Sequence, residues 1–189
     1  MLHHIEAYQG AATTRLAIKL MALTFVRTSE LIGAHWAEFD FESAQWRIPA
    51  HRMKMKTEHI VPLAPQAVEV LRTLKIVSGH SKLLFPGERD HEKPMSNNTI
   101  LSALKRMGYQ GRMTGHGFRG VASTVLHEQG FEHEHIELQL AHTERKSVSA
   151  AYNHAKYLDQ RRALMNHWAN YLQAGLGGQV LRPNFRKAA

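Results

Sequence analysis

The spacing of apolar residues changes twice along this 189-residue chain, and these changes restrict its fold more than any other feature. From Ala11 to Leu23 apolar side chains recur at helical spacing, whereas between Trp36 and Leu63 short runs alternate apolar and polar residues as strands do. Helical spacing resumes at Pro65 and continues through most of the chain. The pattern predicts an α+β, mainly α domain with a small three-stranded antiparallel sheet.

Capping and stop signals place the helices more closely. Thr28 or Ser29 is expected to cap a short second helix with Glu30 in its first turn, so Arg27 lies at a helix junction. Gly79 is a plausible stop for the helix that starts at Pro65. Later helices are expected over residues 96–107, 116–129, 135–141 and 157–172, and the strand runs are 36–41, 45–48 and 59–63.

The chain is long enough for one sizeable core but short for two full domains, with 43% hydrophobic residues. Gly175, Gly177 and Gly178 interrupt the last helical pattern. We therefore expect one domain over residues 1–174 and a basic tail over residues 175–189, flexible or docked on a partner.

Charge and cysteine content indicate the kind of partner and the compartment. Lys and Arg number 24 against 16 acidic residues, and the formal net charge of +8 favours a polyanion, with nucleic acid as the first choice. The chain has no Cys, which rules out disulfides and thiolate sites and is compatible with a reducing compartment. No apolar run approaches membrane-spanning length and no signal peptide is evident. We expect a cytoplasmic protein with no membrane partner.

His116 and Arg119 form the first candidate site. If a helix begins near His116, Arg119 lies one turn further on, and both side chains can address one anion together with the free amides of the helix start. The alternative is that His116 only caps the helix and Arg119 is a solvated surface residue.

Metal-free attack on a phosphodiester needs a nucleophile, positive donors around the phosphoryl oxygens and a proton source for the leaving oxygen. Arg27, Lys54, His142 and Tyr152 are candidates for these tasks. Each also has a simpler interpretation: Arg27 as a surface or ion-pairing residue, Lys54 as part of a solvated basic loop, and His142 and Tyr152 as packing residues.

Other chemistries are less well supported. Residues 115–120 fit G-x-G-x-x-G, but no buried strand precedes them, so a dinucleotide site is improbable. His127 lacks the second histidine of a zincin motif, and the 133–135 segment could bind metal only incidentally. The chain has no phosphate loop of the G-x-x-x-x-G-K-[ST] type, and single, scattered aspartates argue against a two-metal nuclease. We expect no cofactor and no metal.

Five short motifs that follow one another in order support a functional interpretation of these residues more strongly than any of the residues does alone. They are Arg27 within Thr24–Leu31, Lys54 ahead of Val61-Pro62-Leu63, His116-Gly117-Phe118-Arg119, Leu140-Ala141-His142, and Tyr152. Together they resemble the tyrosine recombinase (phage integrase) family, over roughly residues 11–172. Residues 52–55 and 113–119 are most similar to integrases of prophages and genomic islands.

The resemblance implies a catalytic domain that cuts and rejoins DNA through a 3′-phosphotyrosine, with neither metal nor ATP. By this resemblance Arg27 and Arg119 clamp the scissile phosphate, and His116 and His142 assist as hydrogen-bonding and proton-handling groups. Tyr152 attacks phosphorus.

The remaining implied roles concern the lysine and its surroundings. Lys54 would protonate the leaving 5′ oxygen, with Lys56 of the same loop as its rival. Glu30 would orient the site. The partners implied are double-stranded DNA and further copies of the chain in a tetramer on DNA, in a bacterial or phage-derived, nucleoid-associated setting.

Two other functions stay open at this point: a DNA-binding accessory protein with no chemistry, and a type IB topoisomerase that relaxes supercoils. Arg27 lies so near the start that the DNA-clamping domain usual before it is not in this sequence. We therefore expect a catalytic fragment with weak, salt-sensitive DNA binding and no efficient recombination by itself.

Overall fold

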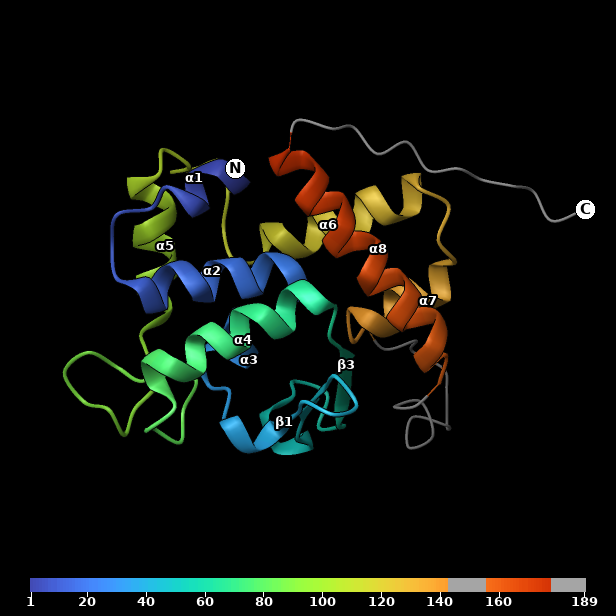
Figure 1. Ribbon diagram of the computed structural model, residues 1–189. Coiled ribbons are helices and arrows are strands. Elements are labelled where there is room, and N and C mark those ends of the chain that lie inside the picture. Colours follow the sequence, from blue (N-terminus) through green and yellow to red (C-terminus); the bar gives the residue numbers. More distant parts are fainter. Residues whose placement is uncertain (143–155, 178–189) are drawn as a thin grey trace, which may run out of the picture.

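Helices make up most of the computed structural model, which describes residues 1–142 and 156–177 (Figure 1). The helices are α1 (Leu2–Glu6), α2 (Ala12–Thr24), α3 (Thr28–Ile32), α4 (Pro65–Ser78), α5 (Asn97–Arg106), α6 (Gly117–Glu128), α7 (His133–Gln139) and α8 (Leu158–Leu176). The strands are β1 (Phe39–Asp40), β2 (Gln45–Ile48) and β3 (His59–Pro62), and η1 (Trp36–Glu38) and η2 (Ala50–Arg52) are 3-10 turns. The predicted α+β, mainly α fold with its small sheet is confirmed.

Helix α2 is the centre of the core. Leu16 and Leu20 lie on one side of this helix and Ile18 and Met21 on the opposite side, and all four are buried. A helix with buried apolar residues on two opposite sides needs neighbours on both of them. Helices α1, α4, α5 and α8 pack against it, and Figure 1 shows α2 and α4 side by side across the middle of the molecule.

The sheet is antiparallel with the strand order β1-β2-β3. Trp46 of β2 lies opposite Val61, and Ile48 lies opposite His59. All four residues of β3 are buried, because this strand also packs against α8. The sheet is therefore attached through β3 to the last described helix.

The first strand is shorter than the alternating pattern predicted. Trp36 and Glu38 lie in η1, where the Trp36 indole N–H donates to the Ser78 carbonyl and the Glu38 carboxylate accepts from the Trp46 indole. These two side-chain contacts hold a turn in a segment whose alternation resembles a strand.

Two helix boundaries also differ from prediction. Helix α3 is capped by Arg27, not by Thr28 or Ser29. Helix α8 continues through Gly175 to Leu176, because one glycine costs a helix only about 1 kcal/mol. Helix α1 was not predicted. Within the described residues, no helix has the length and apolar character needed to cross a bilayer.

Candidate active site

The C-terminal end of α7 is the part of the fold on which the site is built. The Ala141 N–H donates to Leu138 O at 3.0 Å and the His142 N–H donates to Glu137 O at 2.9 Å, a Schellman turn in which Ala141 has the left-handed φ of 49°. A helix end leaves its last carbonyls without helical partners. Here the carbonyls of Gln139, the last helical residue, and of Leu140 and Ala141 just after it accept hydrogen bonds from side chains elsewhere in the chain.

Two arginines from distant parts of the chain bind two consecutive carbonyls of this turn. Arg119 Nη2 donates to Leu140 O at 2.5 Å, and Arg27 Nη2 donates to Ala141 O at 3.2 Å. Cations are favoured at this end of a helix because its dipole is negative there. The turn therefore brings the two guanidinium groups close together.

Arg119 enters this cluster from the first turn of α6. Its side chain is only 3% exposed, and Nη1 donates to Phe25 O at 2.9 Å, just beyond the end of α2. Burial is the main cause that lowers the pKa of Arg119 to about 10, and the nearby charge of Arg27 is the second. The guanidinium therefore remains protonated at neutral pH. The interpretation of Arg119 as a solvated surface residue is wrong.

One nitrogen atom of the Arg119 guanidinium has no partner in the part of the chain that the structure describes. The Nε–H of Arg119 is buried and has no hydrogen-bond partner among the described residues. A buried donor without a partner costs about 1 to 3 kcal/mol, so such a group calls for a partner. The unused donor belongs to the same guanidinium that Leu140 O and Phe25 O hold in place.

Arg27 is held by Glu30 as well as by Ala141. The Glu30 carboxylate accepts from Arg27 Nη1 at 2.7 Å and from the Arg27 backbone N–H at 2.9 Å, which closes the first turn of α3. Glu30 is 1% exposed. Its side chain therefore fixes both the backbone and the guanidinium of Arg27.

His142 completes the group that the structure brings together. Its Nε2 accepts from Arg119 Nη2 at 3.2 Å, and its Nδ1 lies 2.9 Å from the Glu137 carboxylate, to which Nδ1–H donates. Two guanidinium groups lie within range of each other's charge, and Glu30 and Glu137 are the carboxylates that offset it. Such a cluster is suited to bind an anion.

Within the described residues, no side-chain hydrogen bond or ion pair joins the remaining predicted site residues to the two arginines. His116 is the exposed N-cap residue of α6 and makes no side-chain hydrogen bond to any described residue. Lys54 and Lys56 are exposed in the loop before β3, and no contact within the described ranges joins either to the arginines. Tyr152 lies outside the described residues.

Arg52, two residues before Lys54 in the predicted basic loop, is bound to other parts of the protein. It forms an ion pair with Glu38 and donates to the Glu30 backbone carbonyl. The side chains of Arg52 and Glu38 are only 12% and 9% exposed. The loop between η2 and β3, here called the lysine loop because it carries Lys54 and Lys56, is therefore attached at its start to α3, the helix that Arg27 caps.

Three residues near the arginines were missed by sequence reasoning: His59, Gln139 and Arg161. The His59 Nε2–H donates to Gln139 O at 3.2 Å, and Arg161 donates to the Gln139 side-chain oxygen at 3.1 Å and to Ile60 O. One signal was available for Arg161. Arg161 shares helical spacing with the core residues Leu164 and Trp168, so the sequence could have predicted that this arginine lies on the buried face of its helix.

The stability of the protein should depend on pH through His59. Burial is the main cause that lowers the pKa of His59 from 6.5 to about 3, and the charge of Arg161 is the second. Between pH 7 and pH 5 the unfolded chain takes up a proton at this position and the folded protein does not. The free energy of unfolding should therefore fall by about 2 kcal/mol more in the wild type than in a His59→Gln variant. Urea unfolding at the two pH values measures this, and equal falls would contradict it.

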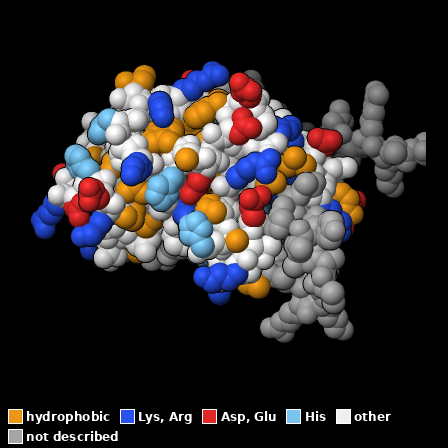
Figure 2. Space-filling view, turned by 90° about the horizontal axis from the view of Figure 1, so that it is seen from below, with side chains coloured by type: hydrophobic (Ala, Val, Ile, Leu, Met, Phe, Trp, Pro, Cys, Tyr) orange, Lys and Arg blue, Asp and Glu red, His pale blue; other side chains and the backbone are white. Residues whose placement is uncertain are grey.

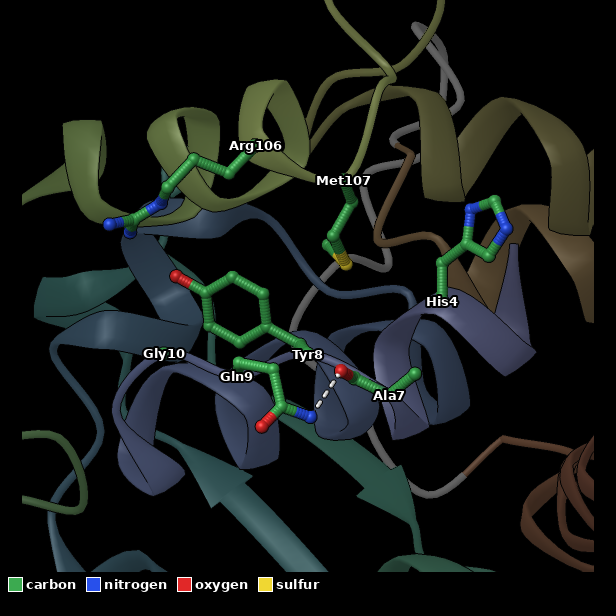
Figure 3. A pocket seen from close by; sticks show the side chains of 7 residues that line it. All are labelled: His4, Ala7, Tyr8, Gln9, Gly10, Arg106 and Met107. Atoms are coloured by element: carbon green, nitrogen blue, oxygen red, sulfur yellow. Dashed lines mark hydrogen bonds between the residues drawn. The ribbon is translucent and has the colours of Figure 1, made fainter.

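A cavity of about 540 Å³ lies elsewhere, between α1 and the end of α5 (Figure 3). Figure 3 shows Tyr8 beside Arg106, whose guanidinium lies 5.5 Å from the ring centre, and Gln9 bonded to Ala7 O. None of the predicted site residues lines this cavity. Within residues 1–142 and 156–177 no group of three or more His, Asp or Glu side chains could hold a metal ion.

Basic and acidic side chains are mixed on one face of the molecule. Figure 2 shows Lys, Arg and His side chains interspersed with acidic ones on the face seen from below. The site itself is defined by its hydrogen bonds, which hold Arg27, Arg119 and His142 at one helix end.

Solved structures share this fold at low sequence identity. The integrase from mycobacterium phage Brujita superposes with a TM-score of 0.67 at 17% identity, covering 99% of this chain and 57% of that chain. The XerH site-specific recombinase bound to difH substrate gives 0.63 at 19% identity, covering 76% and 45%.

Other proteins are more similar to this chain in sequence than these solved structures are. Residues 1–158 match the model of the phage integrase family. The integrase of Enterobacteria phage P4 is 50% identical over 90% of this chain and 43% of its own length, and prophage integrase IntA of Escherichia coli K12 is 37% identical over 99% and 45%. The chain thus spans less than half the length of these relatives. On the family match and these identities, the chain belongs to the phage integrase family.

Proposed function

We propose that this chain is the catalytic part of a site-specific DNA recombinase that cuts and rejoins DNA through a 3′-phosphotyrosine, without metal or ATP. The observation that carries the proposal is the pair Arg27 and Arg119, bound to consecutive carbonyls with His142 beside them. The unpartnered Nε–H of Arg119 is suited to a phosphoryl oxygen.

In the proposed cleavage step, the Tyr152 hydroxyl oxygen attacks phosphorus and the bond from phosphorus to the 5′ oxygen breaks. Arg27 and Arg119 stabilise the negative charge that builds on the phosphoryl oxygens. Lys54 gives its proton to the departing 5′ oxygen, and His116, which is exposed at the start of α6, takes the proton of Tyr152. Lys56 remains the rival for the acid.

The reverse reaction rejoins the strand. The phosphotyrosine keeps the energy of the broken phosphodiester, so a free 5′ hydroxyl can displace Tyr152 with no ATP. Family membership and the DNA-bound recombinases of the same fold support double-stranded DNA as the partner. Assembly of several copies on that DNA belongs to the same proposal.

Covalent trapping tests the proposal. The protein is incubated with duplex DNA nicked just beyond the cleavage site, so that the short 5′ product diffuses away and the adduct accumulates. Because the proposed chemistry uses no metal, we expect an adduct that survives SDS, forms in EDTA without ATP, and disappears after protease treatment. No adduct would favour a DNA-binding accessory protein, and an adduct that needs Mg²⁺ would contradict the proposed chemistry.

A further inference from the structure

The loop that carries Lys54 is attached to the arginine cluster at both of its ends. At its start, Arg52 binds the Glu30 carbonyl and Glu38. At its end, the His59 Nε2–H donates to Gln139 O at 3.2 Å. Between these two attachments the lysines are exposed, so their positions depend on the two ends.

The second attachment uses the same helix end as the arginines. Gln139, Leu140 and Ala141 are consecutive, and their carbonyls accept from His59, Arg119 and Arg27 in that order. A shift of β3 relative to α7 would therefore move the lysine loop relative to both guanidinium groups.

His59 is suited to hold this contact. It is 7% exposed and starts β3, and its low pKa of about 3 keeps the ring neutral. Arg161 reinforces the contact from α8, since it donates both to Ile60 O in β3 and to the Gln139 side chain in α7. The strand and the helix end are thus joined by a direct bond and by a bridge.

We infer that His59 is a positioning residue for the general acid: by binding Gln139 O it sets the distance between the Lys54 loop and the phosphate held by Arg27 and Arg119. The inference rests on the proposed function, because it assumes that Lys54 protonates the leaving oxygen. Its consequence is specific. Loss of the His59 contact should impair proton donation more than attack.

The matched variants are His59→Gln and His59→Asn. Both side chains carry an amide that can donate, but only glutamine reaches about as far as Nε2 of histidine, whereas asparagine falls short of Gln139 O. His167→Asn is the control, since His167 is a partly buried histidine on α8 that bonds to Gln129 at 2.7 Å, away from the loop.

Single-turnover cleavage is measured on two DNA substrates, one with the natural 5′ oxygen and one with sulfur in that bridging position. A sulfur leaving group needs no proton. His59→Asn should lose about 10- to 100-fold on the oxygen substrate, as a misplaced catalytic group does, and recover most of that loss on sulfur. His59→Gln and His167→Asn should stay within a few fold of the wild type on both.

The ratio of the two rates is the deciding quantity, because unfolded protein lowers both rates equally and leaves their ratio unchanged. Lys54→Ala, which removes the proposed acid, calibrates the recovery. If Lys54→Ala recovers on sulfur but His59→Asn does not, or if His59→Asn loses nothing, the inference about His59 is overturned alone. Equal losses of Lys54→Ala on both substrates would overturn the acid role of Lys54, and the inference with it.

Discussion

Replacing Arg119 with lysine is expected to lower the rate of DNA cleavage by about 10³-fold, as the loss of a buried donor to a developing negative charge does in other enzymes. One guanidinium binds Phe25 O and Leu140 O and still has an unpartnered Nε–H. A lysine ammonium is a point charge that cannot hold both carbonyls and also face a phosphoryl oxygen with fixed geometry. Single-turnover cleavage of nicked DNA measures the loss.

The variant should be destabilised as well, by about 1 to 3 kcal/mol, because one buried carbonyl loses its donor. Urea unfolding measures this term, and cleavage is compared under conditions in which both proteins are folded. Arg162→Lys is the matched control, since Arg162 of α8 also donates to a backbone carbonyl, that of Ser43, at 3.0 Å. Cleavage by Arg119→Lys within a few fold of the wild type would contradict the role of Arg119.

Replacing Tyr152 with phenylalanine is expected to abolish the covalent adduct and leave DNA binding unchanged. The change removes one oxygen atom, which is the proposed nucleophile, and keeps the ring. The control is Tyr157→Phe, which removes the same atom only a few residues further on and should retain adduct formation. A gel shift at fixed salt checks binding in both variants. An adduct formed by Tyr152→Phe would assign the nucleophile to another residue.

Much of the fold could be predicted from the sequence because its signals are local. The change of apolar period at Trp36 and Pro65 gave the helices and the sheet, and the step into α3 placed Arg27 at a junction. The extent of β1 and α8 could not be read in this way. Side-chain hydrogen bonds of Trp36 and Glu38 determine where β1 begins, and helix α8 continues past Gly175 where the sequence pattern predicted a break.

Part of the candidate site, the group Arg27, Arg119 and His142, could be singled out from the sequence, but the way these residues are held together could not. Motif order pointed to Arg27, Arg119 and His142, which the structure brings together. No local pattern shows that the carbonyls at the end of α7 hold them, because those bonds join segments far apart in the sequence. His59 was missed for the same reason, since its partner Gln139 lies 80 positions away.

The central claim, that Tyr152 joins the protein to DNA, is tested most directly by identifying the residue in the trapped adduct. Trypsin cleaves after Lys146 and Lys156, and in the peptide between them Tyr152 is the single tyrosine. After nuclease digestion, mass spectrometry should locate the phosphate-linked nucleotide on Tyr152 of that peptide. Attachment at any other residue, or cleavage with no protein-linked nucleotide, would contradict the account.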